Sequence, residues 1–282
     1  MRLELHCHST CSDGSQTPEQ LAQALAEFDA ELVCLTDHDT MAGCERVAAA
    51  LGPRAVRVLR GLELSCKRGK QTIHLLIWGV ADGLGRAALE QRLAEQRERR
   101  RERIVEICGR LASLGVSLDP EPILAGAIGR TPGRPDVAKA LVAAGVCSSP
   151  RDAFDRYLRD DGPANVEIDS ISLAEGLRLG REAGARMGLA HPHTLRHYAV
   201  VRELFVEFRE QGLEGIEAFY GGTSMLRAEP WLRLARELDL VPTGGSDFHG
   251  ETLTEVKRPG IEVPSAYSPR LRAWLSELPA IA

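Results

Sequence analysis

The chain has 282 residues, of which 44% are hydrophobic, and its 40 acidic and 35 basic side chains give a formal net charge of −5. A chain of this length buries about 75% of the surface that its unfolded form exposes, so disorder and dependence on a disulfide framework are both excluded. The negative charge provides no general attraction for polyanions, and a phosphorylated ligand must therefore meet a local group of basic residues.

Short apolar runs alternate with amphipathic patterns in the first third of the chain, which is typical of repeated strand and helix units. Strands are predicted at 3–7, 32–35, 56–64 and 72–80. Helices are predicted at 17–28, 41–51 and 85–114. The first of these helices begins with the capping box Thr17-Pro18-Glu19-Gln20.

This alternation stops at residues 119–166, which are rich in Pro, Gly and Ala. Short helices are predicted there at 134–144 and 151–158, and the segment is therefore interpreted as a small helical insertion. The alternation resumes at Ser172, whose box with Glu175 predicts a helix start. Further strands are predicted at 186–190, 215–218 and 240–244. About seven strand and helix units predict an α/β barrel formed by 1–118 and 167–282.

Most of the eight histidines lie at the ends of predicted strands, together with several carboxylates. The group comprises His6, His8, Asp37, His38, Asp39, Glu63, His191, Asp247 and His249, with His74 inside a strand. Active sites of parallel-strand barrels lie at the carboxyl ends of the strands, so these side chains are expected to converge.

The spacing of His6 and His8, and of Asp247 and His249, is that of metal ligands, because residues i and i+2 of an extended segment point to the same side. Seven scattered cysteines form no CxxC pair, which excludes a thiolate zinc site and indicates reduced thiols. Imidazole and carboxylate ligands suit Mn, Fe or Zn ions that also bind water, and a carboxylate such as Glu63 can bridge two of them.

These motifs resemble those of the polymerase and histidinol phosphatase (PHP) family of metal-dependent phosphoesterases, which is amidohydrolase-like. The resemblance covers nearly the whole chain and is carried by His6-Cys7-His8-Ser9, Cys11-Ser12-Asp13-Gly14, Leu35-Thr36-Asp37-His38-Asp39-Thr40, Gly61-Leu62-Glu63, Ile73-His74-Leu75-Leu76, Ala190-His191-Pro192 and Gly245-Ser246-Asp247-Phe248-His249. It implies a distorted (β/α)7 barrel, with the insertion 119–166 covering the active site.

The resemblance also implies two or three divalent ions, with manganese expected and iron or zinc as alternatives. One ion would be held by His6, His8, Glu63 and Asp247, a second by Glu63, His74 and His191, and a third by Asp13, His38 and His249. A hydroxide produced between two ions would attack phosphorus. Glu63 is thus expected to be catalytic, and His38 or His249 could assist proton transfer if they are not fully committed as ligands.

Four arginines are candidates for binding a second phosphate of the substrate. The apolar stripe of the long helix at 89, 93, 104, 107, 108 and 111 continues through Arg97 and Arg100, with Arg103 nearby. Arg134, in Gly133-Arg134-Pro135, resembles a phosphate-binding residue of the family's phosphatases. The alternative for each of them is an ordinary solvated arginine.

The expected reaction is removal of the 3′-phosphate from a 3′,5′-nucleoside bisphosphate, such as adenosine 3′,5′-bisphosphate giving AMP. The same architecture admits trimming of short RNA 5′ ends. The alternatives are a histidinol-phosphate phosphatase and a non-catalytic scaffold, but all nine ligand positions are filled. No apolar run approaches the length of a membrane span, so a cytoplasmic enzyme with no membrane contact and no obligate protein partner is expected.

Overall fold

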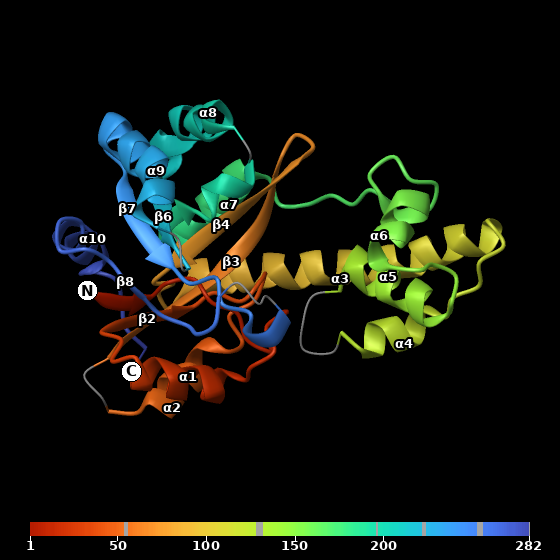
Figure 1. The fold of residues 1–282 in the computed structure, drawn as a ribbon, viewed down its shortest axis with the longest axis horizontal. Coiled ribbons are helices and arrows are strands. Elements are labelled where there is room, and N and C mark those ends of the chain that lie inside the picture. The colour runs from red at the N-terminus through yellow and green to blue at the C-terminus, as the bar shows by residue number, and fades with distance from the viewer. Residues whose placement is uncertain (54–55, 128–131, 196, 222–223, 253–255, 282) are drawn as a thin grey trace. The chain divides into compact units, whose positions relative to one another are not determined.

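A computed structural model describes residues 1–53, 56–127, 132–195, 197–221, 224–252 and 256–281 (Figure 1). The chain divides into two units, Met1–Glu90 with Ile171–Ala282, and Gln91–Ser170. Among the described residues, no helix has the length and apolar character needed to cross a lipid bilayer.

The first unit is built around one sheet of eight strands. These are β1 Arg2–Glu4, β2 Leu32–Leu35, β3 Arg57–Arg68, β4 Gln71–Trp78, β5 Arg186–Leu189, β6 Leu213–Tyr220, β7 Val241–Gly245 and β8 Ile261–Glu262. Their order in the sheet is β7-β6-β5-β4-β3-β2-β1-β8. The predicted α/β barrel is confirmed, because the chain from β1 to β7 follows the order of the strands and the sheet curves until its ends meet.

Helices surround this sheet, and their first turns form as the sequence predicts. They are α1 Pro18–Glu27, α2 Cys44–Leu51, α7 Leu173–Glu182, α8 Tyr198–Phe208, α9 Met225–Leu238 and α10 Ser268–Leu275, together with the start of α3 Leu84–Ser113. Thr17 accepts a hydrogen bond from the Gln20 amide, and the Gln20 side chain accepts one from the Thr17 amide. Ser172 accepts one from the Glu175 amide. Both helix starts are therefore confirmed.

The barrel closes between the segments that follow β1 and β7. The Asp247 amide donates to the His6 carbonyl oxygen at 2.7 Å, and the His8 amide donates to the Phe248 carbonyl oxygen at 2.9 Å. Gly245 allows this approach, because a Cβ at that position would lie 2.2 Å from His6 Cβ. The residues that complete the barrel thus belong to the His6–His8 and Asp247–His249 motifs.

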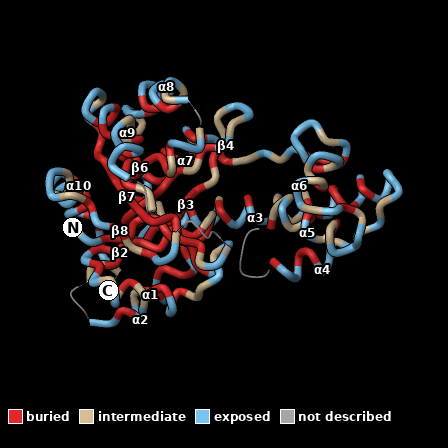
Figure 2. Tube along the Cα trace, viewed as in Figure 1, coloured by how far each residue is buried: buried red, intermediate tan, exposed pale blue. Residues whose placement is uncertain are grey.

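Apolar side chains fill the interior of the barrel. Figure 2 colours most of the strands that carry them as buried. The largest of these side chains include Leu3, Leu5, Leu59, Leu76 and Trp78, each fully buried. Burial of a side chain of this size contributes about 1.5–3 kcal/mol, so this cluster holds the strand ends in fixed positions.

Strand β4 departs from the parallel arrangement on which the site prediction rested. It is antiparallel to both β3 and β5, because only the two residues Gly69 and Lys70 separate β3 from β4, and a parallel pair would need a longer crossover. His74 pairs with Ser65 of β3. It therefore reaches the site from the middle of a reversed strand.

The second unit has a core of its own. It contains the rest of α3, with α4 Pro120–Ala125, α5 Arg134–Ala143, α6 Pro150–Ala153 and a π-helical turn Phe154–Leu158. Ile104, Ile107 and Leu111 of α3 cluster with Val137 and Leu141 of α5. The unit is therefore larger than the segment 119–166, because most of α3 packs with the short helices.

We expect Gly245→Ala to destabilise the protein, because the added methyl group would overlap His6 where the barrel closes. Overpacking of this kind costs about 1–3 kcal/mol, which lowers Tm by roughly 2–10 °C for a chain of this size. Thermal unfolding followed by circular dichroism measures the change.

Gly109→Ala is the matched control, since a Cβ at that position in α3 would meet nothing within 4 Å and alanine favours the helix. Its Tm should equal or exceed that of the wild type. A Gly245→Ala protein with the wild-type Tm would contradict the account of closure given above.

Candidate metal centre

Glu63, at 0% exposure, lies at the centre of the histidine cluster. One of its oxygens, Oε2, lies 3.3 Å from His6 Nε2, 3.2 Å from His8 Nε2 and 3.0 Å from His38 Nδ1. These three histidines follow β1 and β2, the two strands that precede β3 in the sheet. The carboxylate is therefore surrounded by ring nitrogens from neighbouring strand ends.

The other oxygen of Glu63 faces a second pair of histidines. Oε1 lies 2.9 Å from His74 Nδ1 and 3.0 Å from His191 Nε2, and these two ring nitrogens are 3.2 Å apart. The structure thus brings together the set expected for the second ion. A carboxylate with different imidazoles at its two oxygens has the arrangement of a ligand that bridges two ions.

Asp247 adds a second carboxylate to the first set. Its Oδ1 lies 3.2 Å from both His6 Nε2 and His8 Nε2, while its Oδ2 accepts a hydrogen bond of 2.9 Å from the Tyr220 hydroxyl. Tyr220 thereby holds the carboxylate with one oxygen directed to the histidines. His6, His8, Glu63 and Asp247 offer atoms that all lie within 4.8 Å of one another.

Asp13 brings together the remaining predicted ligands, at the most exposed side of the cluster. Its Oδ1 lies 3.4 Å from His249 Nε2, and its Oδ2 lies 3.8 Å from His38 Nε2. His8 joins this group through Nδ1, 3.6 Å from Asp13 Oδ1. The side chain of Asp13 is 52% exposed, in contrast to the buried Glu63.

Several buried atoms of the cluster have the character expected of metal ligands. His6 Nε2, His8 Nε2, His38 Nδ1 and Glu63 Oε2 have no hydrogen-bond partner among the described residues. Buried polar atoms without partners cost free energy, and here they converge on one region. Imidazole and carboxylate donors without a thiolate suit divalent Mn, Fe or Zn, so the residues present fit the ions that the sequence predicts.

Protons stabilise this cluster when no ion is bound. Burial alone would lower the pKa of His8, but the carboxylates of Asp247 and Glu63, each with an oxygen 3.2 Å from its Nε2, raise it to about 10. Burial would likewise raise the pKa of Glu63, yet the surrounding imidazoles, among them His38 and His6, hold it well below its ordinary value. His38 itself is the exception among these rings, because burial lowers its pKa to about 4. Negative carboxylates and positive imidazoles therefore stabilise each other.

The backbone of the site is held in conformations that L-residues rarely adopt. Asp39, His191 and Asp247 have positive φ angles of 54°, 27° and 52°. The Ser65 amide bonds to Asp39 at 2.8 Å, and the Asp247 amide bonds to His6. Strain of this kind costs about 1–3 kcal/mol per residue and is found where surrounding contacts fix a functional geometry.

Other buried carboxylates that the sequence analysis did not assign as ligands hold these segments in place. Asp37 accepts hydrogen bonds from the Ser9 amide and hydroxyl, each 2.7 Å, and from the Ser12 hydroxyl at 2.6 Å. Glu4 accepts 2.9 Å bonds from the amides of His6 and Ser246. The one sequence signal for Glu4 was an acidic residue inside an otherwise apolar strand.

Glu217 of β6 is a further buried carboxylate that sequence reasoning missed. It is 1% exposed, and its two oxygens accept from His6 Nδ1 at 2.8 Å and from the His191 amide at 2.6 Å. It thus contacts a member of each of the two sets that share Glu63. An acidic residue in the middle of an apolar strand again gave the only signal.

The four predicted substrate-binding arginines all belong to the second unit. The Asn165 side chain accepts from Arg103 at 3.0 Å and from Arg134 at 3.2 Å. Burial, with the charges of Arg134 and Arg100, lowers the pKa of Arg103 to about 10. Three of the four arginines are therefore close enough to repel each other.

Arg97 differs from the other three arginines. It is exposed, whereas its neighbour Gln96 is fully buried. The expectation that the apolar stripe of α3 runs inward through Arg97 was wrong, because the inward position is taken by Gln96. The role of Arg97 in substrate binding stays a prediction.

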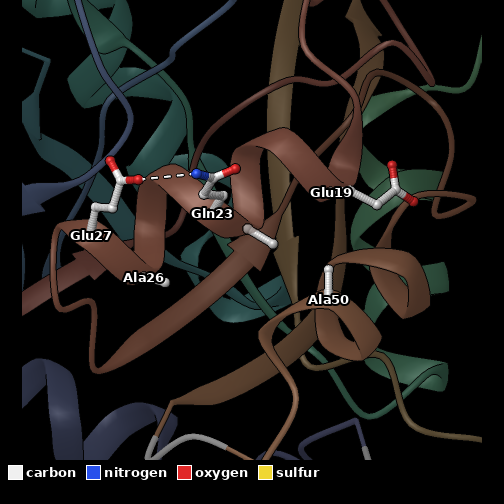
Figure 3. Close-up of a pocket in the computed structure, with 6 residues that line it drawn as sticks. Glu19, Gln23, Ala26, Glu27 and Ala50 are labelled. Carbon is white, nitrogen blue, oxygen red and sulfur yellow. Dashed lines mark hydrogen bonds between the residues drawn. The ribbon is translucent and has the colours of Figure 1, made fainter.

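A surface hollow of about 330 Å³ lies between α1 and α2 of the first unit. It is lined by Glu19, Gln23 and Glu27 with small alanines, and Gln23 bonds to Glu27 (Figure 3). Glu19 is paired with Arg46. None of the candidate ligands lines this hollow, and its acidic wall is unsuited to a phosphate.

Comparison with known proteins adds independent findings. A family model described as PHP domain matches residues 4–108. The chain is 33% identical over 272 residues to the phosphoribosyl 1,2-cyclic phosphate 1,2-diphosphodiesterase of Eggerthella lenta, covering 93% of this chain and 99% of that protein. It is 30% identical over 251 residues to the 5′-3′ exoribonuclease of Haemophilus influenzae, covering 88% of this chain and 90% of that protein. It is 29% identical over 258 residues to the 3′,5′-nucleoside bisphosphate phosphatase of Chromobacterium violaceum, covering 88% and 87%.

Two solved structures share the fold over almost their whole length. An amidohydrolase from Chromobacterium violaceum, solved with bound sulfate and no metal, has a TM-score of 0.79 and 27% identity and covers 99% of this chain and 98% of that one. A metal-dependent phosphoesterase from Bifidobacterium adolescentis has a TM-score of 0.74 and 26% identity, with 96% and 95% coverage. Both resemblances extend over the barrel and the second unit.

We expect metal binding to release protons, because the raised pKa of His8 keeps its imidazole protonated at neutral pH until an ion replaces the proton. Titration of metal-stripped protein with Mn²⁺ at pH 7.5, in two buffers of different ionisation enthalpy, should give different heats. The apparent affinity should rise as the pH approaches 10. Equal heats in the two buffers would contradict a protonated cluster.

Proposed function

The chain belongs to the PHP domain family, whose members are metal-dependent phosphoesterases, and we propose that it removes the 3′-phosphate of a 3′,5′-nucleoside bisphosphate. The observation that carries this proposal is the buried Glu63, whose two oxygens face two different groups of histidines. This arrangement suits two ions held side by side, which is the chemistry that phosphate esters require.

Each ion has a proposed set of ligands within the cluster. The sets are His6, His8, Glu63 and Asp247 for one ion, Glu63, His74 and His191 for a second, and Asp13, His38 and His249 for a third. Manganese is the ion we propose. When bound, the ions supply an activated water and neutralise the charge of the phosphoryl oxygens.

The chain's own residues then orient the groups and transfer protons. His249 donates from Nδ1 to the Asp247 carbonyl oxygen at 2.8 Å, which leaves its Nε2 facing Asp13. His38 presents Nε2 to the same carboxylate. When the third ion is not bound, one of these two nitrogens is free of a metal, and we propose it as the group that gives a proton to the leaving oxygen of the substrate.

The proposed substrate class follows from the relatives and from the arginines. The relatives are enzymes of phosphate esters of ribose: a phosphoribosyl cyclic phosphate, a nucleoside bisphosphate and RNA. A second phosphate needs positive charge, and Arg100, Arg103 and Arg134 supply it in a group whose charges repel each other. An anion bound there would relieve that repulsion.

Two other substrates are supported by single observations. The relative from Eggerthella lenta, 33% identical over 272 residues, favours a ribosyl cyclic phosphate, and the exoribonucleases favour a short RNA end. Histidinol phosphate is disfavoured, because its cationic amine would meet an arginine group. The seven free cysteines are all buried, which is consistent with our proposal of a reducing, cytoplasmic setting.

The decisive test is phosphate release by the Mn-reconstituted protein from adenosine 3′,5′-bisphosphate, with 3′-AMP, 5′-AMP and histidinol phosphate in parallel. We expect release from the bisphosphate to stop at 5′-AMP and 3′-AMP to be a much poorer substrate. Phosphoribosyl 1,2-cyclic phosphate and a 5′-phosphorylated RNA complete the set. Selective turnover of either one, or of histidinol phosphate, would contradict the proposed substrate and identify another. The Glu63→Gln protein serves as the control for phosphate release that does not depend on the metal centre.

The arginine group is tested by Arg103→Gln. Loss of a charged hydrogen bond costs about 1.5–3 kcal/mol, so kcat/KM for the bisphosphate should fall roughly 10- to 100-fold while kcat/KM for 3′-AMP stays unchanged. Arg99→Gln, whose side chain is 67% exposed on the same helix, is the control. An equal loss of kcat/KM for both substrates would show that Arg103 does not bind the second phosphate.

A further inference from the structure

Glu217 is a buried carboxylate that contacts both groups of histidines from the side opposite Glu63. Its Oε1 accepts from His6 Nδ1 at 2.8 Å, and its Oε2 accepts from the His191 amide at 2.6 Å. Among the described residues, no lysine or arginine side chain bonds to it. A carboxylate at 1% exposure with only these partners needs further positive charge nearby, which ions in the cluster would provide.

The contact with His6 determines which ring nitrogen is available to an ion. An ionised carboxylate only accepts hydrogen bonds, so His6 Nδ1 carries a hydrogen, and Nε2, which faces Glu63 and Asp247, is the nitrogen that can bind an ion once it gives up its proton. A carboxylate behind a ligating imidazole also increases the basicity of the ring. Glu217 therefore prepares His6 for the ion that His6, His8, Glu63 and Asp247 would hold.

The contact with His191 acts through the backbone. His191 has a φ of 27°, a strained conformation that the 2.6 Å bond from its amide to Glu217 stabilises. The Thr194 hydroxyl donates to the His191 carbonyl oxygen and accepts from Nδ1, at 3.0 and 3.2 Å. Together these bonds direct His191 Nε2 to Glu63 and His74.

We propose that Glu217 is a positioning residue shared by two metal sites, so that its carboxylate sets the affinity of both ions while Thr194 sets that of one. This inference rests on the metal centre of the proposed function but not on the identity of the substrate. Glutamine has a single oxygen and no charge, so it cannot accept from both donors. Residues behind metal ligands usually change affinity by about 10- to 100-fold.

The test is titration of metal-stripped protein with Mn²⁺ at fixed pH, with bound and free ion counted by equilibrium dialysis and metal analysis. We expect Glu217→Gln to weaken two ions, each about 10- to 100-fold. Thr194→Val, which removes the hydroxyl at constant volume, should weaken one ion only. Glu214→Gln makes the same change three residues earlier in β6, where the amide oxygen can still accept from the Trp274 indole, and should weaken neither.

Two results would overturn the proposal. One is Glu217→Gln protein that binds every ion as the wild type does, and the other is a loss confined to the ion that Thr194→Val also weakens. If Glu217→Gln fails to fold, Glu217→Asp keeps the charge but withdraws both oxygens, and it should weaken the same two ions. A lower Tm of the metal-free protein with unchanged Mn²⁺ affinity would indicate a purely structural residue.

Because metal binding is measured separately from hydrolysis, a failure of the proposed function can be distinguished from a failure of the proposed role of Glu217. If no nucleotide is hydrolysed but the two-ion loss is observed, the proposed substrate fails and the role of Glu217 stands. If the bisphosphate is hydrolysed but Glu217→Gln leaves metal binding intact, the proposed function stands and the shared role is rejected.

Discussion

Two backbone hydrogen bonds join residues 6–8 to residues 247–248, where the first and last parallel strands of the barrel meet. The same residues carry His6, His8 and Asp247, so closing the barrel and assembling one set of ligands are a single event. Gly245 makes the approach possible, and the apolar cluster around Trp78 fixes the strands on either side. The backbone hydrogen bonds and the apolar packing that close the barrel therefore also set the geometry of this set of ligands.

The cost of this arrangement is a set of carboxylates removed from water. Glu4, Asp37, Glu63 and Glu217 are all at most 1% exposed. Backbone amides, hydroxyls or an imidazole donate to Glu4, Asp37 and Glu217, whereas Glu63 Oε2 has no hydrogen-bond partner among the described residues. Burying charge is costly unless partners surround it. These carboxylates have different roles. Glu4 and Asp37 hold backbone segments in place, Glu63 lies among the histidines, and Glu217 contacts His6 on the side of the ring that faces away from Glu63. Positive charge at the centre of the cluster, carried by protons or by metal ions, compensates the negative charge of these carboxylates.

Most of the ligands could be predicted from the sequence because His6, His38, His191 and Asp247 follow strands whose apolar runs are easily recognised, and parallel strands end at one edge. Glu63 was expected at the end of its strand but lies inside β3, which continues to Arg68. His74 reaches the same place by another route, since β4 runs in the opposite direction and only a two-residue turn separates it from β3. Glu217 and Glu4 could not be assigned roles, because their value depends on partners distant in the chain, such as His6 for Glu217. The sequence analysis placed Arg97 on the wrong face of its helix. The middle of this helix has no apolar residues to mark the buried face, so helical periodicity locates that face there only to within one residue.

The closing hydrogen bonds also connect metal supply with the lifetime of the protein. Ions that bind the folded chain and not the unfolded one stabilise it by mass action, and here they would act directly on the segments that hold the barrel closed. Local opening of a barrel begins where its bonding is weakest. When metal is scarce, the first and last strands would separate most readily, exposing extended chain to proteases. The amount of the enzyme in the cell would then fall when the supply of metal falls.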